Sequence, residues 1–124
     1  MRVKCLYNNP DKLPAGFSSN FSYGLELNKT YLVMGIRLFK GQLSFLIDES
    51  GYPNWFPTEI FELNENSLPY DWYFKFKTYP DKKQGALWGF KELCDVEDFY
   101  DLLIERDMEV MAIYFKRKSE FEMQ

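Results

Sequence analysis

The chain has 124 residues, a formal net charge of −4 and an aromatic content of 19%. This length fits one domain, so we expect residues 1–124 to form a single unit. The sequence contains no histidine, so the commonest general base and the commonest metal ligand are missing, and we expect a protein that is not an enzyme.

The N-terminal half is rich in the aromatic and β-branched residues that favour strands. We predict a first strand over Met1–Tyr7 and a long loop over 11–24, a segment rich in Gly, Ser, Asn and Pro. The apolar run Thr30–Leu38 predicts a second strand that is covered on both sides. We place Tyr31 and Val33 on one face of it and Leu32, Met34 and Ile36 on the other.

Shorter strands follow at close intervals. We predict strands over Leu43–Ile47 and Tyr52–Phe56, with the turn Asp48–Gly51 between them. The segment Pro57–Leu63 predicts a single helical turn that leads into a last short strand. After a polar connection, Asp71–Tyr79 alternates between apolar and polar residues, as a half-buried strand does.

The C-terminal part begins with a hairpin and ends with a helix. We expect 86–90 to pair with the preceding strand. Asp95 is a good helix N-cap, and the apolar spacing after it predicts a helix over 96–106. The apolar segment 109–116 fits either a closing strand or a continuation of the helix, and its composition favours a strand. From Ser119 onwards we expect a frayed tail.

The two cysteines, Cys5 and Cys94, lie far apart and neither belongs to a CxxC pair. This excludes a zinc knuckle and a thioredoxin-like motif. Two buried, reduced thiols are the simpler interpretation. The sequence leaves a single disulfide between them open.

The strands between residues 26 and 63 end in Trp55–Leu63, which combines an aromatic pair, a proline, a helical turn and a final strand. This arrangement resembles a small SH3-like barrel. The resemblance implies an α+β fold, mostly β, with the barrel at 26–63 and an extra hairpin and one C-terminal helix over 71–118. The acidic and aromatic loop that completes the peptide groove of SH3 domains is not recognisable, which argues against binding of proline-rich peptides.

Three segments also resemble small bacterial proteins of uncharacterised type, some of which look like immunity partners of secreted toxins. The matching segments are Lys29–Val33, Ile47–Gly51 and Trp55–Phe61. This resemblance implies a protein-binding module that neutralises a cognate toxin by occluding it.

Negative charge is concentrated in residues 92–109, which hold eight acidic side chains and one arginine. In a helix over 96–106, Glu97, Asp101 and Glu105 form one column. Like charges at this spacing cost roughly 0.2–0.5 kcal/mol each. A basic partner would explain why the sequence accepts that cost, since nuclease toxins have cationic active sites. The alternative is a solvated helix face.

In that alternative, the acidic charges pair with Lys75, Lys77 or the basic run 116–118. An aromatic patch supports the binding interpretation, because Tyr and Trp are enriched at interfaces. Tyr52 and Trp55, next to the turn, are the best candidates for it. The predicted partner-binding residues are Asp48, Glu49, Tyr52, Trp55, Glu97, Asp98, Asp101 and Glu105.

Catalytic and metal sites are not expected. The carboxylates of Asp48, Glu49 and Asp95 have turn and capping explanations, and no calcium-loop or glycine-rich phosphate motif occurs. We therefore predict no catalytic residues, no cofactor and no metal.

Two other functions remain open. A regulatory or adaptor module would bind a host protein or peptide, and a small nucleic-acid-binding barrel would stack bases on its aromatic residues. The acidic balance argues against nucleic acid. No apolar run is long enough for a membrane span or a signal peptide, so we expect a cytoplasmic protein that does not bind membranes. An unpaired barrel edge would allow homodimerisation.

Overall fold

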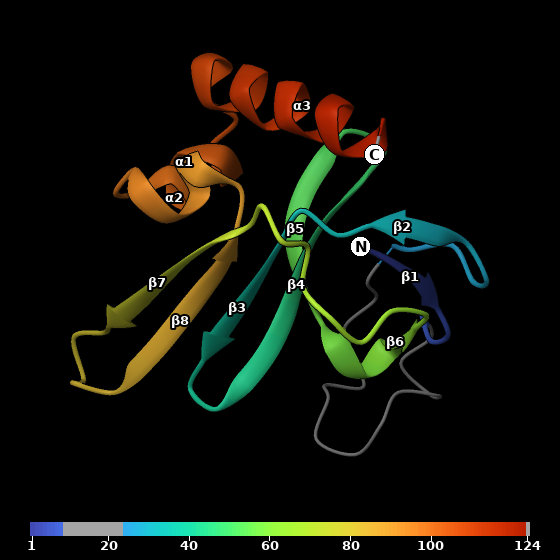
Figure 1. The fold of residues 1–124 in the computed structure, drawn as a ribbon, viewed down its shortest axis with the longest axis horizontal. Helices are drawn as coiled ribbons and strands as arrows, with labels where there is room; N and C mark the ends of the chain where they lie inside the picture. The colour runs from blue at the N-terminus through green and yellow to red at the C-terminus, as the bar shows by residue number, and fades with distance from the viewer. Residues whose placement is uncertain (9–23, 124) are drawn as a thin grey trace.

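The computed structural model describes residues 1–8 and 24–123 as a mixed α+β fold that consists mostly of strands (Figure 1). Apart from Gly24, the loop predicted over 11–24 lies outside the described residues. The strands are β1 (Arg2–Cys5), β2 (Thr30–Leu32), β3 (Gly35–Phe39), β4 (Gln42–Glu49), β5 (Tyr52–Pro57), β6 (Phe61–Leu63), β7 (Tyr73–Thr78) and β8 (Gln84–Gly89). The helical segments are the 3₁₀ turn η2 (Thr58–Ile60), α1 (Lys91–Asp95), α2 (Phe99–Ile104) and α3 (Met108–Glu122).

The strands form two antiparallel sheets. One has three strands in the order β2-β1-β6, and the other has five in the order β5-β4-β3-β8-β7. The chain crosses between the sheets at Val33 and Met34, whose N–H groups donate to the carbonyl oxygens of Met1 and Leu46 at 2.9 and 2.8 Å. It crosses again through η2, between β5 and β6. The two sheets are not closed into a continuous barrel.

The first crossing corrects the single strand predicted over Thr30–Leu38. The segment forms two strands, β2 and β3, one in each sheet. Ile36 therefore shares a core with Tyr31 and Val33 rather than with Met34, because the bend between the strands shifts the alternation of side chains. The expectation that this segment is covered on both sides is confirmed.

Each face of the five-stranded sheet has its own hydrophobic core. The first core lies towards the three-stranded sheet and contains Val3, Cys5, Leu25, Tyr31, Val33, Ile36, Phe45, Ile47, Phe56, Ile60 and Phe61. The second lies towards the helices and contains Met34, Leu46, Trp55, Leu87, Phe90, Leu93, Cys94, Phe99, Leu103, Val110 and Tyr114. Alternation along β4 sends Phe45 and Ile47 to the first core and Leu46 to the second.

The two cysteines are free, and they lie in different cores. The simpler interpretation of the sequence, two buried and unpaired thiols, is therefore the correct one. In the described part of the chain, no helix is long and apolar enough to cross a membrane.

The helix predicted over 96–106 is wrong in its extent. The helix α1 ends at Asp95, Asp98 adopts a left-handed conformation with φ = 62°, and α2 begins at Phe99. The break turns the chain so that Leu93 of α1 and Phe99 of α2 both reach the second core. The C-terminal region therefore contains three short helices where one was predicted.

The strand favoured over 109–116 is also wrong. This segment lies within α3, which starts with the side chain of Asp107 accepting a hydrogen bond from the N–H of Val110 at 3.0 Å. Val110 and Tyr114 are one helical turn apart and both are buried. A helix thus places both side chains on the face that packs against the core. The helix continues to Glu122, and the predicted frayed tail is helical.

The helix α1 packs directly on the backbone of the five-stranded sheet. Gly35 of β3 lies opposite Gly89 of β8, and both face Leu93. A Cβ on Gly35 would lie 2.5 Å from Cδ2 of Leu93 and 3.0 Å from the carbonyl oxygen of Trp88. Only a residue without a side chain allows this approach.

We expect Gly35→Ala to lower the free energy of unfolding by about 1–3 kcal/mol because it overpacks this contact. Urea unfolding measures the change, and Ser119→Ala on the exposed side of α3 is the matched control. In a Leu93→Ala background, Gly35→Ala should cost less, since the clashing methyl group is gone. Equal stability of Gly35→Ala and the wild type would contradict this packing.

Candidate functional site

Asp48, one of the predicted binding residues, is an internal contact instead. Its side chain is only 6% exposed. Its carboxylate accepts hydrogen bonds from the Tyr114 hydroxyl at 3.0 Å and from the Lys118 ammonium at 2.8 Å. Burial and the negative charge of Asp48 raise the pKa of the Tyr114 hydroxyl. Asp48 therefore ties α3 to β4, and the prediction that it lies on a binding surface is corrected.

Glu49 is also satisfied within the chain. It accepts hydrogen bonds from the Tyr31 hydroxyl and, at 3.3 Å, from the Lys29 ammonium. These contacts, with the Tyr31 hydrogen bond first among them, lower the pKa of the Glu49 carboxyl. The turn at the end of β4 is thereby fixed to β2. Only one-fifth of the Glu49 side chain is exposed, and its carboxylate already has partners within the chain.

Trp55 is buried rather than exposed. Only 9% of it is accessible, and its ring lies 5.3 Å from the ring of Tyr100 in α2. Alternation along β5 turns it towards the helices, where it joins the second core. The sequence did not reveal this burial, because the helices that cover Trp55 come from residues far along the chain.

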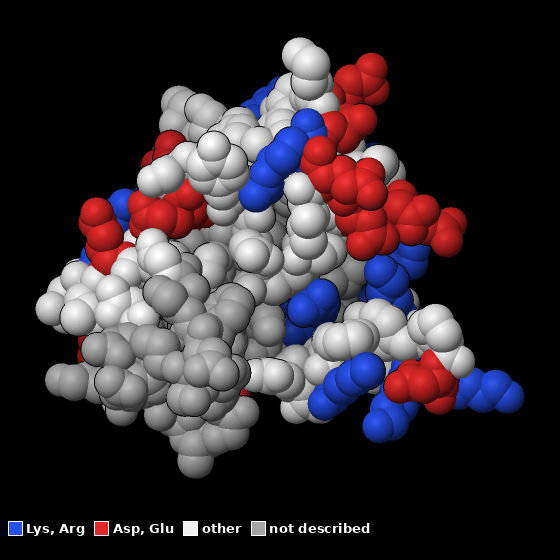
Figure 2. Space-filling model, turned by 180° about the vertical axis from the view of Figure 1, so that it is seen from behind, with Lys and Arg blue, Asp and Glu red and all other residues white. Residues whose placement is uncertain are grey.

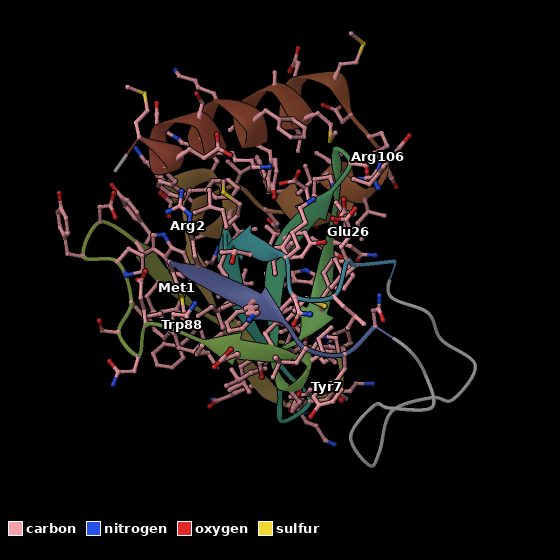
Figure 3. All side chains as sticks on the ribbon, turned by 90° about the vertical axis from the view of Figure 1, so that its right-hand side faces the viewer. Met1, Arg2, Tyr7, Glu26, Trp88 and Arg106 are labelled. Atoms are coloured by element: carbon pink, nitrogen blue, oxygen red, sulfur yellow. The ribbon has the colours of Figure 1, made fainter. Side chains whose placement is uncertain are left out.

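Tyr52 remains at the surface, with 63% of its area exposed. The guanidinium of Arg106 lies 5.0 Å from the centre of the Tyr52 ring and donates to the carbonyl oxygens of Pro53 and Leu103. Arg106 thus holds the end of α2 against the start of β5 (Figure 3). The structure therefore brings Tyr52 next to the acidic segment, a neighbourhood that the sequence did not predict.

Arg106 is a functional candidate that sequence reasoning missed. The available signal was its position as the one basic residue among the eight acidic residues of 92–109. In the structure, the partners of Arg106 are an aromatic ring and two carbonyl groups.

Four predicted binding residues remain exposed and form what we call the acidic surface: Glu97, Asp98, Asp101 and Glu105. They do not make the predicted column, because Glu97 and Asp98 lie in the break before α2. Figure 2 shows acidic side chains gathered over the helical part of the molecule and basic ones over the β7–β8 hairpin. On this face of the molecule, acidic side chains therefore predominate over part of the helical region and basic side chains over the hairpin.

Among the described residues, the acidic surface takes part in no ion pair. Arg117 pairs with Glu92 at 2.7 Å and with Glu120 at 2.9 Å, and Lys118 pairs with Asp48. None of the ion pairs within residues 1–8 and 24–123 includes a member of the acidic surface. Within the part of the chain that the structure describes, the basic run 116–118 therefore does not form the ion pairs with the acidic surface that the alternative predicted.

The two thiols and the acidic side chains are also candidates for reactive or metal-binding groups. Burial raises the pKa of the Cys5 thiol and raises that of Cys94 to about 11, which leaves both as poor nucleophiles. No cluster of three or more potential metal-ligating side chains occurs among these residues. The chain matches no protein-family model, no curated protein and no solved structure.

We expect the free energy of unfolding to fall in acid, because the pKa values of Glu49 and Glu92 are lowered in the folded state. Hydrogen bonds from Tyr31 and from Arg117, respectively, are the main causes. Such groups contribute stability above their ordinary pKa of 4.5, and this contribution is lost as the pH falls through the lower folded values.

Urea unfolding between neutral pH and about pH 3 measures this loss. Glu49→Gln should flatten the pH dependence, and Tyr31→Phe should flatten it in the same way because it removes the main donor to Glu49. A pH dependence in either variant as steep as that of the wild type would show that this hydrogen bond does not set the titration.

Proposed function

We propose that this protein is a non-enzymatic protein-binding module, and most specifically an immunity protein that neutralises a cognate toxin by covering a basic surface on it. The observation that carries the proposal is the acidic surface, which is exposed, unpaired within the described chain and adjacent to the exposed ring of Tyr52. An occluding partner needs complementary shape and charge, and it needs no catalytic group.

The electrostatics favour a cationic partner. Like charges held close together repel, so the acidic surface costs stability that a positively charged partner would recover. Complementary charge also speeds encounter by drawing the two proteins together before they touch. Toxin domains that cleave nucleic acid fit this chemistry, because they bind phosphates through basic residues.

Tyr52 would supply the contact that holds the complex together. A few residues carry most of the binding energy of many interfaces, and Tyr is enriched among them. The Arg106 guanidinium packs against the ring at 5.0 Å, so the ring would lose little freedom when a partner covers it. The acidic surface would thus steer the partner and Tyr52 would anchor it.

We further propose that residues 26–63 belong to an SH3-like barrel that serves as the framework. The supporting features are the order β2-β1-β6 in one sheet, the meander β3-β4-β5 in the other, and the helical turn η2 that leads into β6. The hairpin β7–β8 extends this framework beyond β3, and the helices add the acidic surface. Binding would then use the added helices rather than a groove of the barrel.

The first experiment is a pull-down with the tagged protein from a lysate of its native source grown under competition. One stoichiometric partner with a basic domain, inhibited when the two are mixed, would support the immunity function. Capture of a regulatory host protein would favour an adaptor module instead. Retention on heparin at physiological salt would favour a nucleic-acid-binding barrel and overturn the proposal.

With the partner in hand, we expect Asp101→Lys combined with Glu105→Lys to slow association about tenfold at low salt. Stopped-flow or surface-based kinetics at several salt concentrations would measure it. The matched control is Glu59→Lys with Glu62→Lys, which makes the same change of charge at exposed positions on η2 and β6. An equal effect in the control would mean that net charge alone is responsible.

We also expect Tyr52→Ala to speed dissociation about tenfold or more without changing the melting temperature, because the ring is exposed in the free protein. Tyr70→Ala is the matched control, since Tyr70 is 97% exposed and outside the helical part of the molecule. Equal dissociation rates for Tyr52→Ala and the wild type would remove Tyr52 from the interface.

A further inference from the structure

Arg37 of β3 lies in a box of aromatic rings on the helix side of the five-stranded sheet. Its guanidinium carbon is 4.9 Å from the centre of the Trp55 ring, 5.0 Å from that of Phe39 and 5.6 Å from that of Tyr100. Its Nε atom is buried and has no hydrogen-bond partner among the residues that the structure describes. The proposed function makes no use of this residue.

The positive charge of Arg37 is also uncompensated. No carboxylate among the described residues forms an ion pair with it. Burial lowers the pKa of its guanidinium, because a buried site disfavours the charged form. The surrounding rings recover part of this cost through cation–π contacts, but they offer no acceptor for the N–H groups.

Two lysines extend the basic character of this face. Arg37 lies opposite Leu87 of β8, which in turn lies opposite Lys75 of β7, so the three residues form one row across the sheet. Lys77 is exposed on the same face of β7, two residues further along. Because β8 lies between β3 and β7, the backbones of Arg37 and Lys75 are about 10 Å apart, and the lysine side chain can cover part of this distance.

The same face is recessed. Figure 2 shows the molecule hollowed between the helices and the β7–β8 hairpin, with basic side chains inside the hollow and along the hairpin. The ring of Tyr79 stands over Gly85 and packs against Phe39 at 4.6 Å, which builds one wall. The ring of Tyr100 in α2 lies 5.6 Å from the Arg37 guanidinium carbon, so a residue from the helices also borders Arg37.

We propose that Arg37 is a receptor for a single carboxylate of a protein partner, an Asp or Glu side chain or a chain terminus, with Lys75 and Lys77 flanking it. A guanidinium presents a planar fork of donors that matches the two oxygens of a carboxylate. An arriving carboxylate would supply the missing counter-charge and would accept hydrogen bonds from the Nη groups, which are not buried as Nε is. This site is independent of the acidic surface, since the two recognise groups of opposite charge.

The surroundings favour one carboxylate over a nucleic acid. The rings of the box turn towards Arg37, so their faces are occupied and do not offer a platform for stacking bases. Asp101 follows Tyr100 directly in α2, which places the acidic surface beside the hollow. A chain of phosphates would bring several negative charges close to the acidic surface, whereas one carboxylate brings a single charge.

The direct test uses nuclear magnetic resonance to follow the Nε–Hε signal of Arg37 in the full-length protein. The probes are a capped Gly-Glu-Gly peptide, the matched Gly-Gln-Gly peptide, inorganic phosphate and an oligothymidylate. We expect the glutamate peptide to shift this signal in a saturable way and the glutamine peptide to leave it unchanged. An absent shift, or stronger binding of phosphate or oligothymidylate, would overturn the proposal.

Two variants distinguish the contribution of the planar guanidinium from that of positive charge alone. Arg37→Lys keeps the charge but lacks the fork, and we expect it to bind the glutamate peptide about tenfold more weakly, as backbone amide shifts in the hollow would report. Lys83→Met, on the exposed hairpin turn, loses a charge outside the box and should bind as the wild type does. Equal affinities for Arg37→Lys and the wild type would overturn the proposal. Circular dichroism confirms that each variant is folded.

Discussion

Burial of one sheet on both faces is the constraint on which the rest of this structure depends. Strand β4 sends Phe45 and Ile47 into one core and Leu46 into the other, so neither core forms without the same strand. Its neighbour β3 lies close enough to α1 for Leu93 to contact the backbone of Gly35. The positions of the helices, and therefore of every exposed charge on them, follow from this shared sheet.

The charged groups divide according to whether that packing gives them a partner. Three acidic side chains have partners on neighbouring elements: Asp48 binds Lys118, Glu49 binds Tyr31, and Glu92 binds Arg117. These contacts hold the elements together. The acidic surface on and beside α2 and the guanidinium of Arg37 receive no such partner among the described residues. Uncompensated charge of both signs would help the proposed binding module to discriminate between partners, because complementary charge steers association and like charge opposes it.

Local patterns predicted the strands well and the helices poorly. The hairpins β4–β5 and β7–β8 follow from turn residues flanked by apolar or alternating runs, which are signals within a few residues of each other. The break at Asp98 has no such signal, because its left-handed backbone serves contacts of Leu93 and Phe99 with a distant sheet. The β-branched and aromatic residues of 109–116 predicted a strand, but the segment is helical in α3. Burial of Val110 and Tyr114 in a core outweighs their weak intrinsic preference for strands.

The sequence by itself determined the strand-rich character of the protein, the concentration of acidic residues in 92–109 and the exposure of most of them, because hydrophobic spacing and charge are properties of short segments. Only the tertiary structure decided that Trp55 and Asp48 are internal, that Arg106 brings Tyr52 to the acidic surface, and that Arg37 lies in an aromatic box. Each of these depends on contacts between residues tens of positions apart. Which side chain is covered, and which charge is paired, is set by how the elements pack and not by the residues beside them.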